Sequence, residues 1–406
     1  MLRDLASNLK KAFLPYVEVT HEALAPLMNF VWSKAVRKVA TASMQHLLLA
    51  CSEEELMAKL FAAMHPTFLA QIADATTKKD YVEMRMKLKG LLGCTRLFQS
   101  DRMLSLKDVE STIAVLAQSL ALQREARQIA ENEWAKIAKK ADEQELEDHM
   151  ESLEKLDKVG TIVMDISGCF AKNYGEAVTE AFKTHLLEHF ALTFEKPEPT
   201  EKEVLDAICF FVDVLEFLGE GLFVAMHRPI TEAMLKLAPK YLADEEDRQI
   251  IQSITYGVGV VAQRASKQQF AEYLAPTFDL LNKVLSEGDC RENEDKAIAT
   301  ECAIGALGKL VYFQFDGTLV TDKVASSFIG LLPLVAEPEE AQNVHKQFFK
   351  MVLAGNAGVV GEGGAHAAEI KQAVERIAAT HTGKPELEIL DDEGKEVIQA
   401  VQEMLA

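Results

Sequence analysis

The chain has 406 residues, of which 49% are hydrophobic, 26% charged and 7% aromatic, with 11 prolines. This composition excludes an intrinsically disordered protein and favours long helices over a β-sandwich or a barrel. The 63 acidic residues outnumber the 43 basic ones, for a net charge of -20. That balance argues against a nucleic-acid or anionic-membrane surface and favours basic protein partners, unless the acidity only keeps a large protein soluble.

The six cysteines are scattered through apolar helical stretches without a CxxC pair, which is typical of reduced intracellular proteins. The first residues, MLRDLASNLKKAF, carry charges every few positions and lack the apolar core of a signal peptide. The chain contains no uninterrupted run of 18 apolar residues, the length needed for a transmembrane helix. We therefore expect a soluble protein that is not secreted by the usual signal.

Residues 2–30 predict a helix that breaks near Pro15, because proline removes an interior hydrogen-bond donor. A second helix is expected over 33–50. The next begins at a capping box that starts with Ser52 and runs to about Asp74, and 79–98 pairs with it. Gly90 and Gly93 in that last helix predict close contact with a neighbour.

From residue 105 the apolar residues keep helical spacing to Ala141, which predicts one unusually long helix or two nearly joined ones. Its continuation to Asp157 carries eight carboxylates and a single basic residue, Lys155. This acidic run is either a solvated helix face or a site for a basic partner segment. Core spacing returns over 159–174. The candidate partner-binding residues in the run are Glu147, Asp148, Glu151 and Glu154.

A helix over 177–194 is expected to pack back on the preceding one, and a capping box at Thr200 begins the next. In that helix Asp213 and Glu216 lie one turn apart, and Asp206 extends the stripe towards its start. These three carboxylates are candidates for binding a basic partner. The alternative is an ordinary solvated face.

The stretch 244–285 contains two amphipathic patterns separated only by Ala265, Ser266 and Lys267, which predicts an antiparallel helical hairpin. The same pattern recurs along the chain at intervals of about 45 residues, two of them longer, the period of HEAT or armadillo repeats. Its openings fall near Lys34, Asp80, Glu147, Glu201, Asp247, Asp295 and Glu339.

Further helices are expected over 292–313, 322–335, 337–353, 367–380 and 391–405, with a glycine-rich loop over 355–364. The predicted fold is all-α, a right-handed solenoid of about seven to eight antiparallel helix pairs. We divide it into N-terminal repeats (1–104), a long-helix acidic insertion joined to a repeat (105–175), and C-terminal repeats with capping helices (176–406).

Two motifs resemble catalytic or cofactor sites. His185, Glu188 and His189 match the H-x-x-E-H string of some zinc metallopeptidases, but a third ligand has no evident source, and a partly exposed helix surface explains them more simply. Gly257 and Gly259 open a G-x-G-x-x-A string inside a helix rather than after a strand, so close helix packing explains them better than a dinucleotide. We predict no enzyme, metal or cofactor.

Six segments together resemble the C-terminal part of karyopherin-β nuclear import receptors, and most closely the importin β-3 type. They cover nearly the whole chain in order. They are LPYVE (14–18), the acidic helix to Asp157, ICFFVDVLEF (208–217), RQ followed by YGVGVVAQ (256–263), ATECAIGALGKLV (299–311) and LLPLVAEPEEA (331–341).

The resemblance implies a monomeric receptor that moves between cytoplasm and nucleus and passes transiently through the nuclear pore. It implies basic cargo, similar to histones or ribosomal proteins, on an acidic concave face, and Phe-Gly nucleoporins bound between helices. Ran-GTP would bind the full-length receptor and this chain weakly or not at all, since the principal Ran-binding repeats of the longer family members lie in their N-terminal part. Two alternatives stay open: a HEAT-repeat scaffold for a phosphatase- or proteasome-associated complex, and, remotely, the metallopeptidase.

Overall fold

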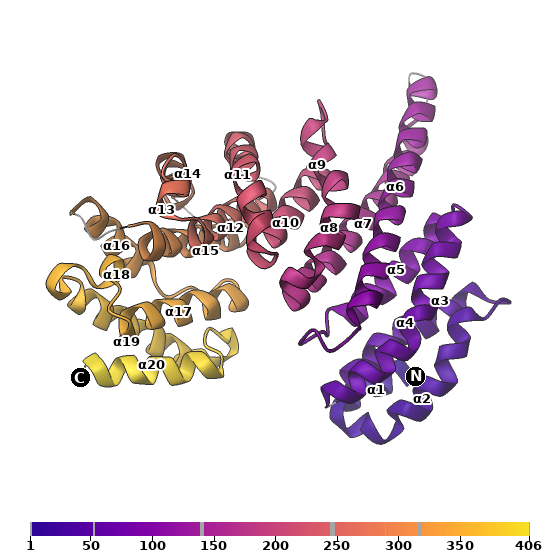
Figure 1. The fold of residues 1–406 in the computed structure, drawn as a ribbon, viewed down its shortest axis with the longest axis horizontal. Coiled ribbons are helices and arrows are strands. Elements are labelled where there is room, and N and C mark those ends of the chain that lie inside the picture. Colours follow the sequence, from indigo (N-terminus) through magenta and orange to yellow (C-terminus); the bar gives the residue numbers. More distant parts are fainter. Residues whose placement is uncertain are drawn as a thin grey trace. The chain divides into compact units, whose positions relative to one another are not determined.

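The computed structural model describes residues 2–51, 53–138, 142–243, 248–288, 290–315 and 319–405. Every regular element in these ranges is a helix, so the predicted all-α solenoid is confirmed (Figure 1). The chain divides into two compact units, Met1–Phe223 and Val224–Ala406. Each unit stacks antiparallel helix pairs side by side in two layers. None of the helices in the described ranges is both long and apolar enough to cross a lipid bilayer.

In the first unit, α3, α5, α7 and α10 follow one another as neighbours in one layer, and α4, α6 and α8 form the other. Pro15 falls in the short helix η1, which separates α1 from α2 as the sequence predicts. The elements are α1 (Leu2–Leu9), η1 (Lys10–Tyr16), α2 (Val17–Leu24), η2 (Ala25–Asn29), α3 (Lys34–Leu49), α4 (Glu54–Thr77), α5 (Tyr81–Thr95), α6 (Leu106–Ile137), α7 (Glu143–Tyr174), η3 (Gly175–Val178), α8 (Thr179–His185), α9 (Leu187–Glu195) and α10 (Glu201–Phe217).

In the second unit, α12, α15, α17 and α20 form one layer, and α16 packs on α19 in the other. Helix α11 begins just before the unit boundary. The elements are α11 (Glu220–Leu242), α12 (Gln249–Arg264), α13 (Lys267–Phe270), α14 (Leu274–Leu285), α15 (Glu294–Lys309), the π-helical turn η4 (Leu310–Gln314), α16 (Leu319–Leu331), α17 (Pro338–Leu353), α18 (Ala357–Val360), η5 (Glu362–Gly364), α19 (Ala367–Gly383), η6 (Pro385–Leu387) and α20 (Asp392–Leu405).

The predicted repeat openings fall in the second helix of each pair, at or near its start. They lie in α3, α7, α10, α15 and α17, Asp80 is the N-cap of α5, and Asp247 lies outside the described residues. The sequence therefore locates the repeat correctly but pairs its helices wrongly over 244–285. Helix α12 packs most extensively on α15, and α14 also packs on α15. The stretch thus joins the second helix of one repeat to the first helix of the next, instead of forming a repeat by itself.

The starts of α10 and α7 are fixed by capping boxes, the first of which the sequence predicts. Thr200 accepts a hydrogen bond from the backbone of Glu203, whose side chain bonds back, so the predicted capping box is present. Asp142 and Glu145 form a second box at the start of α7. Such a pair satisfies two backbone donors that the first turn of a helix leaves unbonded. The predicted box at Ser52 lies outside the described residues.

The close helix contacts expected at glycines are confirmed. A Cβ atom on Gly90 would overlap Thr41 of α3, and one on Gly259 would lie 3.0 Å from both Cα and Cβ of Ala306 in α15. Gly257 and Gly259 are both buried in the middle of α12, and Gly259 lets its backbone approach that of α15. They therefore belong to the packing of the second unit and not to a nucleotide site.

Three local predictions are corrected. The helix expected over 177–194 is divided into η3, α8 and α9, with an interruption at Leu186. The long helix ends at Ile137, before Ala141, which lies outside the described residues. The glycine-rich segment 355–364 contains the short helix α18, because Asn356 caps it and also donates to the carbonyl of Tyr312.

Candidate partner-binding surfaces

Asp206 lies inside the layer formed by α7 and α10, and not on its surface. Its side chain is only 5% exposed, the hydroxyl of Thr161 donates to both carboxylate oxygens at 3.1 Å, and Lys202 lies 3.3 Å away. Burial raises its pKa to about 6, although Lys202 and Thr161 act in the opposite direction. A carboxylate enclosed in this way holds two helices together, so we leave Asp206 out of the surfaces proposed below.

Asp213 and Glu216 are half-buried two turns further along α10. The Asp213 carboxylate lies against Gly168 of α7, where any larger residue would collide with it. Burial raises the pKa of Asp213 to about 8, and repulsion from Glu216 and Asp165 adds to this effect, while Lys172 opposes it. An incoming positive charge would stabilise the ionised form of carboxyl groups that are crowded in this manner.

Asp165 connects this group to the neighbouring repeat. Its carboxylate forms an ion pair with Arg96, at the end of α5, with 2.6 Å between the nearest atoms. Asp165, Asp213 and Glu216 form one cluster of acidic side chains on α7 and α10, which we call the α10 acidic cluster. The sequence predicts its α10 members, but Asp165 is part of it only because the two helices pack together.

The other acidic candidates, Glu147, Asp148, Glu151 and Glu154, are all exposed on the first half of α7. Glu151 pairs with Lys155 and Glu154 with Lys158, each at 2.6 Å and one helical turn apart. Exposed pairs of this kind contribute little to stability. The acidic run is continuous with the core part of α7, and the α6–α7 hairpin projects beyond its neighbours in the first unit (Figure 1).

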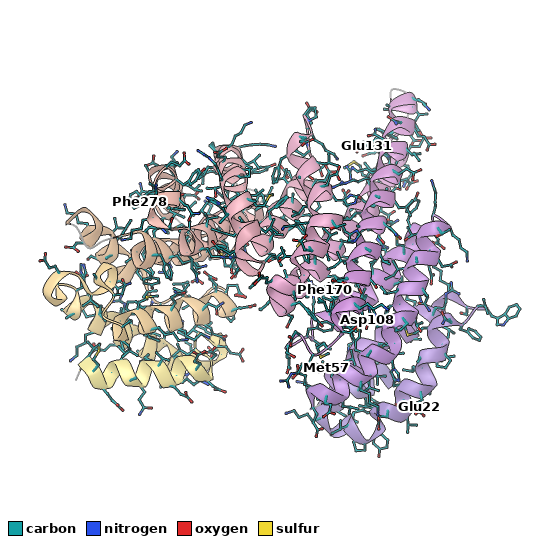
Figure 2. The ribbon with its side chains drawn as sticks, in the orientation of Figure 1. Glu22, Met57, Asp108, Glu131, Phe170 and Phe278 are labelled. Atoms are coloured by element: carbon teal, nitrogen blue, oxygen red, sulfur yellow. The ribbon has the colours of Figure 1, made fainter. Side chains whose placement is uncertain are left out.

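The second unit contains an apolar slot between α14 and α16, with α15 as its floor. Its volume is about 420 Å³, within the range of small-ligand sites. Phe278, which Figure 2 labels, and Leu285 line one wall, Val324 and Leu331 line the other, and Leu307 closes the base. Asn282, Ser286, Ser327 and Lys323 supply polar groups at the rim. We call this the Phe278 slot.

The histidines of the H-x-x-E-H string are separated by the interruption at Leu186. His185 ends α8, whereas Glu188 and His189 lie in α9. The ring of His189 lies 3.2 Å from a guanidinium nitrogen of Arg124, and burial together with that positive charge lowers its pKa. Within the described ranges no group of three or more acidic, histidine or cysteine side chains is arranged to hold a metal ion.

No protein-family profile matches the chain. Solved structures of Kap121p do match over its full length. The structure of Kap121p has a TM-score of 0.63 and 15% identity, and covers 100% of this chain. The structure of Kap121p bound to Nup53p has a TM-score of 0.63 and 14% sequence identity, and covers 99% of this chain. The structure of Kap121p bound to the SUMO protease Ulp1p has a TM-score of 0.64 and 16% sequence identity, and covers 98% of this chain.

The chain has a karyopherin-like fold. At this level of identity the likeness concerns the fold alone, and the importin β-3 type stays a prediction. The chain spans 36% of the length of each of these Kap121p chains. In this karyopherin-like fold the Phe278 slot lies between the first helices of adjacent repeats.

The sequence does not reveal the Phe278 slot. Its residues have the spacing of an ordinary buried helix face, and Phe278 and Leu285 belong to the apolar face of the second amphipathic pattern in 244–285. In the structure both are half-buried, because α14 and α16 leave a gap that neither fills. Only the distance between two helices from different repeats creates the slot.

Proposed function

We propose that this chain is the cargo- and pore-binding part of a nuclear transport receptor of the importin β-3 type. The observation that carries the proposal is the Phe278 slot, an open apolar site between neighbouring repeats of a karyopherin-like fold. Solved structures show Kap121p bound to Nup53p, Ste12p and Pho4p, which supports partners of the same kinds here. The chain then acts in cytoplasm and nucleus and at the pore between them.

The slot suits the phenylalanine of a Phe-Gly segment. Phe278, Leu285, Val324 and Leu331 offer apolar contact to the ring, and the rim side chains Asn282, Ser286 and Ser327 offer hydrogen-bond partners to the flanking backbone. A single shallow slot binds weakly. Several such slots along one receptor give useful avidity while each contact still exchanges rapidly.

The acidic side chains suit basic cargo. We assign the binding of lysine- and arginine-rich segments to the α10 acidic cluster and to Glu147, Asp148, Glu151 and Glu154 on α7. The net charge of -20 attracts such segments before they make contact. Ran-GTP is expected to bind the longer receptor, and this chain weakly or not at all.

The test is binding of a fluorescent peptide of several Phe-Gly repeats to the 406-residue chain. Ser327→Trp is designed to fill the slot, and Ala400→Trp on the exposed face of α20 is the matched control. We expect weak binding that Ser327→Trp reduces at least fivefold and Ala400→Trp leaves unchanged. Binding unaffected by Ser327→Trp, or equal binding of a Ser-Gly peptide, contradicts the assignment to this slot.

A further inference from the structure

The α6–α7 hairpin forms a cleft with the beginning of α5. Helix α5 starts at Tyr81 and has 15 residues, while α6 and α7 have 32 each, so the hairpin extends beyond the N-terminal start of α5. At this step the structure has a cleft of about 330 Å³. Its lining consists of Tyr81, Val82 and Arg85 from α5, Ala126, Ile129, Ala130 and Glu133 from α6, and Ser152, Lys155 and Leu156 from α7. Figure 2 shows Glu131 on the projecting part of α6.

The cleft continues as an apolar stripe along α6. Ala126, Ile129, Ala130, Glu133 and Ile137 recur at helical spacing, so they share one face of the helix. Large apolar side chains on this face are open to solvent, with Ile129 46% and Ile137 50% exposed, and Val82 across the cleft is 53% exposed. Because their side chains are short, Ala126 and Ala130 leave a depression between these larger side chains. The same side of the hairpin is covered further along by α5, which packs on α7.

Side-chain contacts join the two helices in the projecting part of the hairpin. The rings of Trp134 on α6 and His149 on α7 stack with their centroids 4.5 Å apart and their planes 7° from parallel. Arg127 on α6 forms ion pairs with Glu131 on the same helix and with Asp157 on α7. The Trp134–His149 stack and the Arg127–Asp157 ion pair thus join α6 to α7 at two levels of the hairpin.

The charge beside the cleft determines the kind of partner that fits it. The lining itself carries Arg85 and Lys155 beside Glu133, and Lys155 is paired with Glu151 at 2.6 Å. Further out, residues 142–154 contain seven carboxylates and no lysine or arginine. Of these, Glu145 and Asp148 precede Ser152 at helical spacing, on the α7 face that lines the cleft, and Glu133 adds a carboxylate from α6. An apolar segment inserted here would therefore meet negative charge at its outer end, beyond Arg85 and Lys155.

We propose that this cleft binds an amphipathic helix of a partner protein that carries lysine or arginine beside its apolar face. The helix takes the position that α5 would occupy if it were longer, with leucine-sized side chains against Ile129 and Ala130. Its basic residues pair with Glu133, Glu145 and Asp148. This deepens the proposed function, because it distinguishes a folded, apolar-anchored partner at the hairpin from an extended basic tail on the α10 acidic cluster.

The experiment uses the 406-residue chain and a designed, fluorescently labelled 18-residue helical peptide. The peptide has leucine at i, i+3, i+4 and i+7 positions and lysine on both flanks. One control peptide replaces leucine with serine, and another replaces lysine with glutamate. We expect the leucine-lysine peptide to bind at least tenfold more tightly than either control. Equal binding of the serine peptide indicates a purely electrostatic contact and overturns the proposal, and so does the absence of binding.

Two pairs of variants locate the site. Ala130→Phe fills the cleft, while Ala135→Phe adds the same ring to an exposed position of α6 outside it. Glu133→Lys reverses a charge at the cleft, and Glu110→Lys does so at the far end of the helix. We expect at least tenfold weaker binding from the first member of each pair and less than twofold change from the second, with unchanged thermal unfolding. Equal effects within a pair overturn the site. The Phe278 slot lies in the other unit, so its own test fails or succeeds independently.

Discussion

The buried carboxylate of Glu301 in α15 accepts a hydrogen bond from the backbone N–H of Ala336 at 2.8 Å. The same carboxylate accepts from the N–H groups of Val335, at 2.5 Å, and Glu337, at 3.2 Å, and its side chain is only 1% exposed. One side chain thus satisfies three donors in the segment that leads into α17. This residue thus joins the second helix of one repeat to the turn between the two helices of the next.

Glu301→Gln should therefore destabilise the second unit. The amide replaces one acceptor oxygen with a donor that faces a backbone N–H, and an unsatisfied buried donor costs about 1–3 kcal/mol. We expect the free energy of unfolding, measured by urea denaturation, to fall by about 2 kcal/mol. Glu396→Gln, on the exposed face of α20, is the control and should change it by less than about 0.5 kcal/mol. Equal stability of the two variants contradicts this account.

His345 should make stability depend on pH. Its ring is fully buried, Nε2 accepts from the N–H of Leu334 at 3.0 Å and Nδ1 donates to the carbonyl of Ile389 at 3.1 Å. This arrangement requires a neutral ring, and burial lowers its pKa from 6.5 to about 4. Between those values the unfolded chain binds the proton and the folded chain does not, so stability falls as the pH falls from 6.5 to 4.

The loss attributable to His345 should reach about 3 kcal/mol at pH 4, since one pKa unit corresponds to about 1.4 kcal/mol. The measurement is urea denaturation between pH 4 and 7 for the natural chain and for His345→Gln, which cannot titrate. The difference between the two stability curves isolates the residue. A difference that stays constant across this pH range would show that His345 does not titrate as described.

Binding of a basic peptide to the α10 acidic cluster should release a proton. The pKa of Asp213 is about 8, so this group is mostly protonated at pH 7, whereas a bound lysine or arginine favours its ionised form. Affinity for a histidine-free, lysine-rich peptide should therefore increase from pH 6 to pH 8, by up to about tenfold per pH unit, and then become constant. Fluorescence anisotropy at constant salt measures this.

Asp213→Asn is the control for that experiment, because it keeps the shape of the side chain and removes the titration. Its peptide affinity should show no rise between pH 6 and 8. Raising the salt concentration should weaken binding to the natural chain, since the contacts are ion pairs. An affinity that is independent of both pH and salt argues against basic cargo at this cluster.

Gly259 should be intolerant of even a methyl group. A Cβ atom there would lie 3.0 Å from Ala306, in the contact between α12 and α15, and neither backbone has room to move freely. Overpacking of this kind costs about 1–3 kcal/mol, so Gly259→Ala should lower the unfolding midpoint. Gly330→Ala in α16 is the matched control. A Cβ atom at Gly330 meets nothing within 4 Å, and alanine there should leave stability unchanged or raise it by up to about 1 kcal/mol.

Helix type, repeat period and capping are determined by the sequence alone, because they depend on local chemistry. Thr200 and Glu203 stand at the spacing of a capping box and form one. The recurring pattern near Lys34, Asp80 and Glu201 marks the second helices of the pairs, since those helices pack on equivalent neighbours and need equivalent side chains. The acidic run before Asp157 is also visible in the sequence.

The tertiary structure alone decides which of these residues a partner can reach. Asp206 and Asp213 look alike in sequence and both face α7, but Asp206 is enclosed by Thr161 and Lys202 and only 5% exposed, while Asp213 is half-buried. The Phe278 slot and the cleft at Ile129 exist because helices from different repeats differ in length and spacing. A helical pattern specifies which face of a helix is apolar, but the distance to the neighbouring helix determines whether that face is filled or left open.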